Sequence, residues 1–317
     1  MKAATRINDL QIGQKSFFQR LKRDIKRNYS LYLLVLPVIL FYALFHYKPM
    51  YGLIIAFKRF NPSLGIMDSP WVGFSNFEQF FKGFYFERVL KNTLIISFAN
   101  LIFSFPAAII MALLLNEIKN KLFAKTVQTI TYMPHFISLV VVCGMVVDFV
   151  SYDGVVNQIL AMFGVDPVMF LQDPKAFVPI YVISGIWQEV GWSSIIYLAA
   201  ISGINAELYE AATIDGAGRL RQVLAVTLPG IAPTIVIMLL LSIGNIMSLG
   251  YEKIILLYNP MIYETSDVIS SYVYREGLEN FNFGLSTAVG LFNSVINFIL
   301  VMVANKISRL ISDTSLW

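Results

Sequence analysis

Six long apolar stretches alternate with shorter polar segments along the 317 residues of this chain. A helix needs about 20 apolar residues to cross the hydrocarbon core of a bilayer, and each stretch has about that length or more. Backbone amides in lipid must be paired within their own segment, so we expect each stretch to be a helix. The approximate limits are 29–47, 93–115, 127–147, 177–204, 223–249 and 285–304. The pattern predicts an all-α membrane protein with six transmembrane helices.

The first stretch is the least regular of the six. Lys48 and Pro49 interrupt it, and residues 53–57 are apolar again, which is typical of a short re-entrant or interfacial piece. Prolines within later stretches, Pro106 and Pro134, are compatible with transmembrane helices because neighbouring helices can satisfy the freed carbonyl groups.

Composition agrees with a membrane protein. Hydrophobic residues make up 57% of the chain and charged residues 14%. Charged residues are roughly a quarter of a soluble domain, so lipid must be the solvent for much of this surface. The single cysteine, Cys143, excludes a disulfide framework. His46 and His135 are far apart in sequence and have no cysteine or histidine partner, so we predict no metal site.

Lysine and arginine gather in alternate polar segments, and this asymmetry predicts the orientation of the chain. Both termini are then cytoplasmic, where the basic residues are Lys15, Arg20, Lys22, Arg23, Lys26, Arg27, Lys119, Lys121, Lys125, Arg219, Arg221, Lys306 and Arg309. The predicted outer segments 151–176 and 250–284 are mainly acidic. The first outer segment, 48–92, is an exception because it holds six basic residues.

A short amphipathic helix is predicted in the cytoplasmic segment 205–221. Asn205 can cap its N-terminus, Glu207 lies in its first turn, and Gly216 and Gly218 can end it. Residues at i, i+3, i+4 and i+7 share one face: Leu208, Ala211, Ala212 and Asp215. Small alanines would let this face lie in a groove of another protein, with Glu210 paired to a donor there. The same pattern also fits a helix lying on the membrane surface, and the local sequence leaves both interpretations open.

The complete string over residues 210–233 is more specific than the helix alone. Glu210-Ala211-Ala212, then Asp215-Gly216-Ala217, then Leu228-Pro229 and Pro233 resembles the EAA loop of binding-protein-dependent ABC importer permeases. The resemblance implies that this loop is the helix that couples the permease to a cytoplasmic ATPase. The coupling residues it implies are Glu210, Ala211, Ala212, Asp215, Gly216, Ala217 and Arg219.

Further strings extend the resemblance over nearly the whole chain. Residues 47–52, 56–58, 69–74, 92–93, 258–260, 263–269 and 272–278 resemble the LplB-like branch of the carbohydrate-uptake permeases, which is similar to the maltose-type importers. The resemblance implies a type I ABC importer permease in the bacterial plasma membrane, for a complex sugar or oligosaccharide. We divide the chain into a basic cytoplasmic tail at 1–28 and a single transmembrane permease domain at 29–317.

The chain has no G-x-x-x-x-G-K-[ST] string to bind a nucleotide, so ATP must be bound by a separate subunit. No cofactor is therefore predicted for this chain, and no catalytic constellation indicates an enzyme. Short cytoplasmic loops favour import over export. The resemblance implies a second permease, usually a different chain, two ABC ATPase subunits and an extracellular or periplasmic solute-binding protein. The basic tail is predicted to contact anionic lipid rather than nucleic acid.

Polar residues inside the predicted spans are candidates for the translocation path. Glu189 is the only acid deep in a span, where a charge costs at least roughly 2.5–3.5 kcal/mol. Trp192 follows at i+3 and can offer an aromatic platform for a sugar, although the acid can equally be hydrogen-bonded between helices. Asn245, Asn293 and Asn297 are further candidates, but amides also join helices in membranes.

Two rival functions remain at this point. A secondary carrier would be expected to show inverted repeats, and no clear repeat is present. An ABC permease for a non-sugar solute fits the same motifs, because part of the specificity resides in the binding protein.

Overall fold

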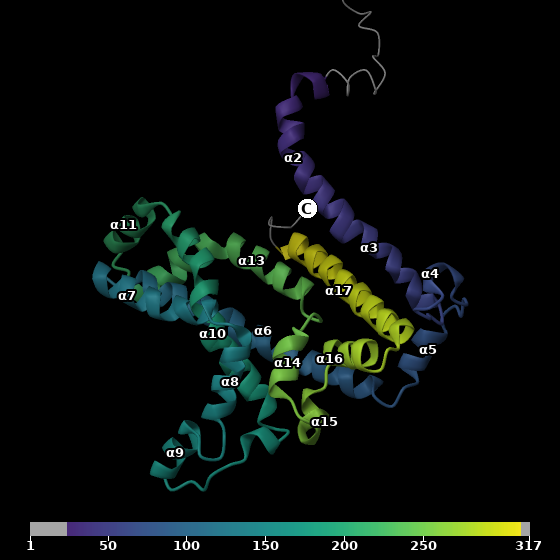
Figure 1. Cartoon of the computed structure of the whole chain (residues 1–317). Helices are drawn as coiled ribbons and strands as arrows, with labels where there is room; N and C mark the ends of the chain where they lie inside the picture. Colours follow the sequence, from purple (N-terminus) through teal and green to yellow (C-terminus); the bar gives the residue numbers. More distant parts are fainter. Residues whose placement is uncertain (1–23, 312–317) are drawn as a thin grey trace, which may run out of the picture. The chain divides into compact units, whose positions relative to one another are not determined.

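The computed structural model describes residues 24–311, and all secondary-structure elements in this part are helices (Figure 1). The predicted all-α class is confirmed. Most of the predicted basic tail, residues 1–23, lies outside the described part. The chain divides into two compact units, Met1–Ile54 and Ile55–Trp317.

The described part of the first unit is one long apolar helical stretch. It comprises α2 (Tyr29–Tyr42), the π turn η2 (Ala43–Tyr47) and α3 (Lys48–Met50), and it continues as the 3-10 helix η3 (Tyr51–Phe57). The predicted interruption at Lys48 and Pro49 is therefore wrong. Proline can be accommodated here because the chain widens into a π turn, in which the amide of Lys48 donates to the carbonyl of Ala43.

The second unit begins with two short helices and then forms its longest one. The elements are α4 (Gly65–Asp68), α5 (Ser75–Phe81), α6 (Phe86–Asn116), α7 (Lys121–Tyr132), the 3-10 helix η4 (Met133–Phe136) and α8 (Leu139–Phe149). The stretch predicted as one helix at 127–147 is broken, with a bend of 102° between its two parts. Ile137 and Ser138 are extended here, and Pro134 supplies no amide hydrogen to continue the helix.

The middle of this unit contains the remaining cytoplasmic loop of the prediction. The elements are α9 (Val155–Met162), η5 (Phe170–Gln172), α10 (Phe177–Ser202), α11 (Ala206–Ile214), α12 (Arg219–Gln222), the π turn η6 (Val223–Thr227) and α13 (Leu228–Gly244). The rest comprises α14 (Tyr251–Leu257), η7 (Pro260–Ile262), α15 (Tyr263–Ser266), α16 (Ile269–Tyr274), the π turn η8 (Arg275–Glu279) and α17 (Phe283–Ile311).

Within residues 24–311, four helices are long and apolar enough to cross a membrane, and the bent pair brings the number to five. The four are Tyr29–Phe57, Phe86–Asn116, Arg219–Gly244 and Phe283–Leu310. The fourth predicted span corresponds to α10, which has 26 residues. It does not reach the same apolar content because it carries Ser184, Gln188, Glu189 and Ser193.

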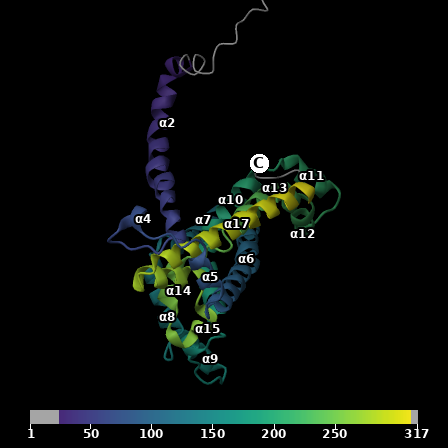
Figure 2. The ribbon, with the colours of Figure 1, turned by 90° about the vertical axis from the view of Figure 1, so that its right-hand side faces the viewer.

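The two ends of the second unit hold different short elements. Helices α11 and α12 lie at one end, whereas α9 and α15 lie at the other (Figures 1 and 2). Hydrogen bonds join the segments at the second end: Asn259 Nδ2 lies 2.7 Å from the carbonyl of Leu171, and Thr265 Oγ1 lies 2.6 Å from that of Pro174. Two segments far apart in sequence therefore form one surface.

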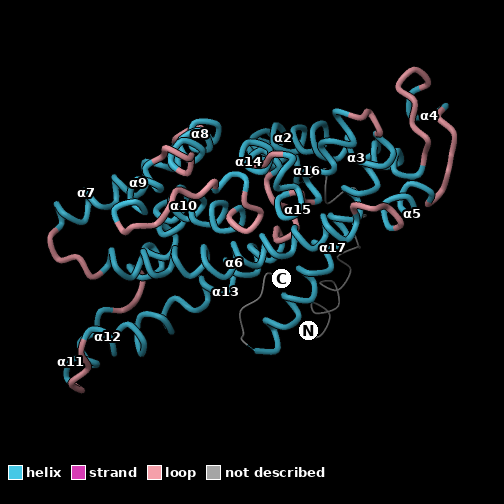
Figure 3. Tube along the Cα trace, turned by 90° about the horizontal axis from the view of Figure 1, so that it is seen from below, coloured by secondary structure: helices cyan, strands magenta, loops and turns pink. Residues whose placement is uncertain are grey.

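Helices α6, α10 and α13 lie beside one another and position the site (Figure 3). Near α11, their contact is a buried cluster of small and large side chains, Ala108, Ala112, Tyr197, Ile201 and Ile231. Alanines on α6 permit the close approach that transmembrane helices need. Gly191 of α10 lies so close to α7 that a Cβ there would be 2.1 Å from the carbonyl oxygen of Thr131.

Candidate functional site

Helix α11 is capped at both ends as its sequence predicts. The Oδ1 of Asn205 accepts from the amide of Glu207 at 3.1 Å. Gly216 has a φ of +76°, the left-handed conformation that a glycine adopts without strain after a helix. The amide of Ala217 then donates to the carbonyl of Ala212 at 2.9 Å, which closes a Schellman motif.

The surface of α11 faces outward from the second unit. None of its nine residues is buried. Leu208, Glu210 and Ala211 are exposed, as are Asp215 and Arg219 beyond the helix end, whereas Ala212 and Ala217 are half-buried. Ile214, which the sequence analysis missed, is 86% exposed. Leu208 is exposed as well, so this short helix presents two large apolar side chains that a partner protein could cover.

Side-chain contacts of Tyr209, Gln222 and Arg219 hold this loop to the rest of the unit. The hydroxyl of Tyr209 lies 3.0 Å from Thr227 Oγ1. The Nε2 of Gln222 donates to Thr213 Oγ1 and to the carbonyl of Ala217, both at 3.0 Å. Arg219 lies 3.7 Å from Glu117 at the end of α6. The last contact brings together the two loops that the charge pattern assigns to the cytoplasm.

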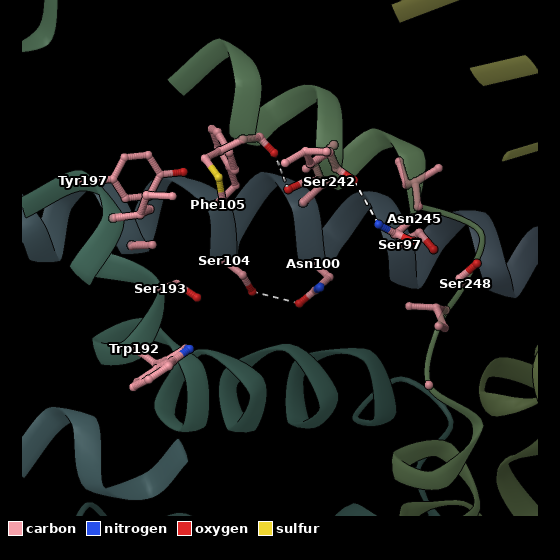
Figure 4. Close-up of a pocket in the computed structure, with 18 of the residues that line it drawn as sticks. Ser97, Asn100, Ser104, Phe105, Trp192, Ser193, Tyr197, Ser242, Asn245 and Ser248 are labelled. Carbon is pink, nitrogen blue, oxygen red and sulfur yellow. Dashed lines mark hydrogen bonds between the residues drawn. The ribbon is translucent and has the colours of Figure 1, made fainter. Parts of the chain in front are cut away.

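A cavity of about 890 Å³ lies between α6, α10, α13 and the turn that follows α13. Ligand pockets commonly have volumes of about 300–1,000 Å³, and this cavity falls within that range. Figure 4 shows side chains of the three helices lying around one hollow. The hydroxyl and amide groups come from Ser97, Asn100, Ser104, Ser193, Ser242, Asn245 and Ser248, and the aromatic rings from Phe105, Tyr181, Trp192 and Tyr197. Among the described residues that line it, none is charged.

Two of the predicted path residues line this cavity. Trp192 lies at its edge on α10, and Asn245 caps the end of α13, where its Nδ2 donates to the carbonyl of Leu241 at 3.1 Å. Glu189 lies one turn before Trp192 and is about half exposed, and its Oε2 lies 2.9 Å from Nδ1 of His135.

His135 is a residue that the sequence analysis discounted. Its ring stacks on Trp192 with a centroid distance of 4.5 Å and an interplanar angle of 2°. Phe136 lies edge-on to the same indole, at 5.4 Å. One face of Trp192 is therefore covered by His135. A polar aromatic residue beside Pro134 within an apolar stretch was the available signal.

The two asparagines predicted on the last span have other surroundings. Asn297 is buried, accepts from the amide of Met247 at 3.0 Å and donates to Ser248 Oγ at 2.8 Å. It therefore ties α17 to the turn after α13. The Oδ1 of Asn293 is buried and has no hydrogen-bond partner among the described residues.

A buried cation lies behind the cavity wall. Lys253 of α14 donates from Nζ to the carbonyl of Tyr181 at 2.9 Å and lies 4.6 Å from the centre of the Tyr181 ring. The ammonium group has no carboxylate within 4.0 Å among residues 24–311. Its positive charge is thus stabilised by a carbonyl dipole and an aromatic ring rather than by an ion pair.

A second charged cluster joins α6 to the segment 264–275. The carboxylate of Asp267 is fully buried and lies 2.9 Å from Arg88 Nη2 and 2.8 Å from Arg275 Nη2. Asn92 Nδ2 donates to the carbonyls of Glu264 and Asp267. Burial opposes the charge of Arg275, but the hydrogen bonds and attraction of Asp267 outweigh it, so the pKa of Arg275 is raised above its ordinary value.

The comparison with protein families decides between the remaining interpretations. A family model described as "Binding-protein-dependent transport system inner membrane component" matches residues 88–313. The chain belongs to this family. The permease is therefore an inner-membrane transport component and not an enzyme, as predicted, and the secondary-carrier alternative is wrong.

Two proteins of Bacillus subtilis (strain 168) are similar to this permease over most of their length. The polygalacturonan/rhamnogalacturonan transport system permease protein YteP is 42% identical over 310 residues, which cover 98% of this chain and 97% of YteP. Protein LplB is 42% identical over 286 residues, which cover 90% of each chain. The predicted resemblance to the LplB-like branch is confirmed.

Solved structures share the fold. The crystal structure of a bacterial ABC transporter involved in the import of the acidic polysaccharide alginate matches with a TM-score of 0.86 and 48% identity, covering 92% of this chain and 99% of that chain. The alginate transporter in complex with an alginate pentasaccharide-bound periplasmic protein matches with a TM-score of 0.87 and 47% identity, covering 94% and 100% of the two chains. The permease thus has the fold of an ABC importer permease.

Proposed function

We propose that this permease forms, with a second and different permease chain, the membrane path of an ATP-driven importer. A solute-binding protein delivers the solute outside the membrane, and two ABC ATPase subunits bind ATP on the cytoplasmic side. The observation that carries the proposal is α11, a capped helix with an exposed face and no buried residue. Such a helix has little reason to persist in water on its own, so a docking partner is expected to cover it.

The ATPase contact is proposed for the EAA loop. Glu210 and Asp215 present exposed carboxylates. The small side chain of Ala211 lets the ATPase approach the helix closely. Gly216 reverses the chain without strain, and Arg219 follows at the start of α12. These residues, together with the half-buried Ala212 and Ala217, form the proposed coupling surface.

The proposed solute is an oligosaccharide that contains acidic sugars. Hydroxyl and amide groups in the cavity suit sugar hydroxyls, and aromatic rings such as Trp192 suit the apolar faces of sugar rings. Lys253 adds a positive potential behind Tyr181, which favours an anionic solute. YteP, named for polygalacturonan, and the alginate transporter support the same class. Trp192 and Asn245 are the proposed solute contacts, and Glu189 lies one turn from Trp192 with its carboxylate against His135.

Six spans with both termini in the cytoplasm complete the proposal. The four apolar helices and the bent pair provide five spans, and α10 provides the sixth because its 26 residues reach about 39 Å. Arg219 and Glu117, from two loops assigned to the cytoplasm, are in contact. Asn259 and Thr265 bond to a second segment assigned to the outside. Both contacts support the alternation.

Replacing Glu210 by lysine tests the coupling surface. The permease is reconstituted with its second permease, ATPases and binding protein, and uptake of labelled oligogalacturonate and alginate pentasaccharide is measured. Because the substitution reverses an exposed charge on the proposed contact, we expect uptake to fall about tenfold or more. Co-purification of the ATPases should weaken as well, since a tenfold loss of affinity corresponds to about 1.4 kcal/mol of binding free energy. The control for co-purification is Asp153→Lys, an exposed charge reversal in the segment assigned to the outside, which should leave ATPase binding unchanged. Normal uptake by Glu210→Lys would refute the coupling role.

A further inference from the structure

In the proposed coupling role, helix α11 must transmit a displacement, and few side-chain contacts attach it to the rest of the permease. None of its residues is buried, and both of its connections contain glycine: Gly203 before it, and Gly216 and Gly218 after it. Glycine-containing connections bend easily, so a pull on α11 would be absorbed there. A direct side-chain contact between α11 and a long helix is therefore needed to carry the displacement.

Tyr209 provides such a contact. Its side chain is half-buried on the inner side of α11, and its hydroxyl lies 3.0 Å from Oγ1 of Thr227, 18 residues later in the chain. Thr227 is 1% exposed, so this hydrogen bond is shielded from water at its far end. Gln222 continues the polar link, because its Nε2 donates to Thr213 of α11 and to the carbonyl of Ala217.

The position of Thr227 explains why the contact forms there. Thr227 is the last residue of the π turn η6, and the amide of Leu228 donates to the carbonyl of Val223 five residues earlier. Pro229 has no amide hydrogen, so the carbonyl of Ala225 lacks its α-helical donor and the helix widens. Turns of this kind often lie at functional sites. The widened turn places a buried hydroxyl opposite α11.

The displacement can continue from Thr227 to the cavity. Helix α13 begins at Leu228. Its residues Met238 and Ser242 line the cavity, as does Asn245, which caps its C-terminus. Helix α13 is about 25 Å long and stays one continuous helix past its internal Pro233, so a displacement at Leu228 is carried along it to the cavity. The alternative connection, Arg219 to Glu117, spans 3.7 Å between exposed side chains. Exposed pairs of this kind contribute little.

We propose that the hydrogen bond between Tyr209 and Thr227 is the mechanical link through which α11 moves α13 and thereby reshapes the cavity. Tyr209 and Thr227 are positioning residues that contact neither ATP nor solute. The inference rests on the proposed coupling role of α11 but concerns the transmission step, which lies between ATPase docking and solute movement. It requires that a permease lacking one of these hydroxyls still supports ATP hydrolysis but transports less solute for each ATP hydrolysed.

The experiment removes each hydroxyl in the fully reconstituted transporter. Tyr209→Phe and Thr227→Val each delete one hydroxyl, whereas Thr227→Ser keeps it. For the two deletion variants we expect ATPase co-purification and ATP hydrolysis to persist. Uptake of labelled oligogalacturonate per ATP hydrolysed should fall about fivefold or more, as for the loss of one hydrogen bond. Thr227→Ser should retain normal coupling, and the double variant Tyr209→Phe/Thr227→Val should be no worse than either single one.

The controls separate this inference from the proposed function. Thr126→Val deletes an exposed hydroxyl that, within residues 24–311, donates to the carbonyl of Leu122 in its own helix, and it should leave coupling unchanged. Normal uptake per ATP in Tyr209→Phe overturns the link while leaving the docking role of Glu210 intact. Loss of ATPase co-purification in Tyr209→Phe would make Tyr209 part of the docking surface. Additive losses of coupling in the double variant would show that the two hydroxyls act independently. Each of these two results also overturns the link.

Discussion

The carboxylate of Asp267 shows how single residues hold this permease together. It is fully buried between Arg88 of α6 and Arg275 of η8, and it also accepts from Ser271 Oγ at 2.9 Å. Both arginines therefore depend on this one carboxylate. Arg88 and Asp267 are 179 residues apart in sequence, so the cluster joins α6 to the segment after α15.

Replacing Asp267 by asparagine should destabilise the permease strongly. The substitution keeps the shape of the side chain but leaves two partly buried guanidinium groups without their counter-charge, which typically costs about 3–5 kcal/mol. The melting temperature of the purified permease in detergent measures the effect. Glu279→Gln is the matched control, because Glu279 is exposed in the same segment and should change stability by less than about 0.5 kcal/mol. Equal melting temperatures for the two variants would contradict this account.

At the scale of elements, the crossing of α7 and α10 depends on one small residue. A Cβ at Gly191 would lie 2.1 Å from the carbonyl oxygen and 2.5 Å from the carbonyl carbon of Thr131. Backbone atoms cannot move aside as a flexible side chain can. The same crossing places His135 against Glu189 and Trp192, so its geometry also sets the edge of the cavity.

Gly191→Ala should therefore push α7 away from α10. Overpacking of this kind costs roughly 1–3 kcal/mol, and we expect a lower melting temperature together with slower solute uptake. The control is Gly144→Ala in α8, where a Cβ would meet no atom within 4 Å. That substitution should be neutral or slightly stabilising because alanine favours a helix. A Gly191→Ala variant as stable as Gly144→Ala would show that the helices can separate at no cost.

The sequence predicted the elements better than their breaks and contacts. Apolar length locates the long helices because lipid forces the backbone to pair internally, and the caps at Asn205 and Gly216 follow from local chemistry. Pro134 did not predict the break between η4 and α8, since proline occurs both in continuous and in broken transmembrane helices. The partners of Glu189 and Asn297 depend on residues about 50 positions away, His135 and Met247, so local patterns could not separate cavity contacts from contacts between helices.

For the whole molecule, the proposed mechanism requires two sides that are chemically distinct. One end of the second unit holds α11 and α12, and the other holds α9 and α15. The segments 117–125 and 205–221 together carry five basic and four acidic residues, whereas 151–176 and 250–284 together carry three basic and eight acidic residues. The cavity lies among helices that connect these ends. An ATPase can act on α11, and a binding protein on the other end, only if a membrane separates the two ends.

Cysteine accessibility tests this arrangement directly. Cys143 is buried and is replaced by alanine to give a background without thiols. Single cysteines at Ile214 and Asp153, both exposed, are then treated with a membrane-impermeant maleimide. In right-side-out vesicles we expect labelling of the Asp153→Cys variant alone, and in inverted vesicles of the Ile214→Cys variant alone, because an uncharged bilayer interior excludes the charged reagent. Labelling of both variants after detergent treatment shows that both thiols are reactive. If Ile214→Cys were labelled in right-side-out vesicles, α11 would lie outside the cell, and neither ATPase docking nor the Tyr209–Thr227 link could operate.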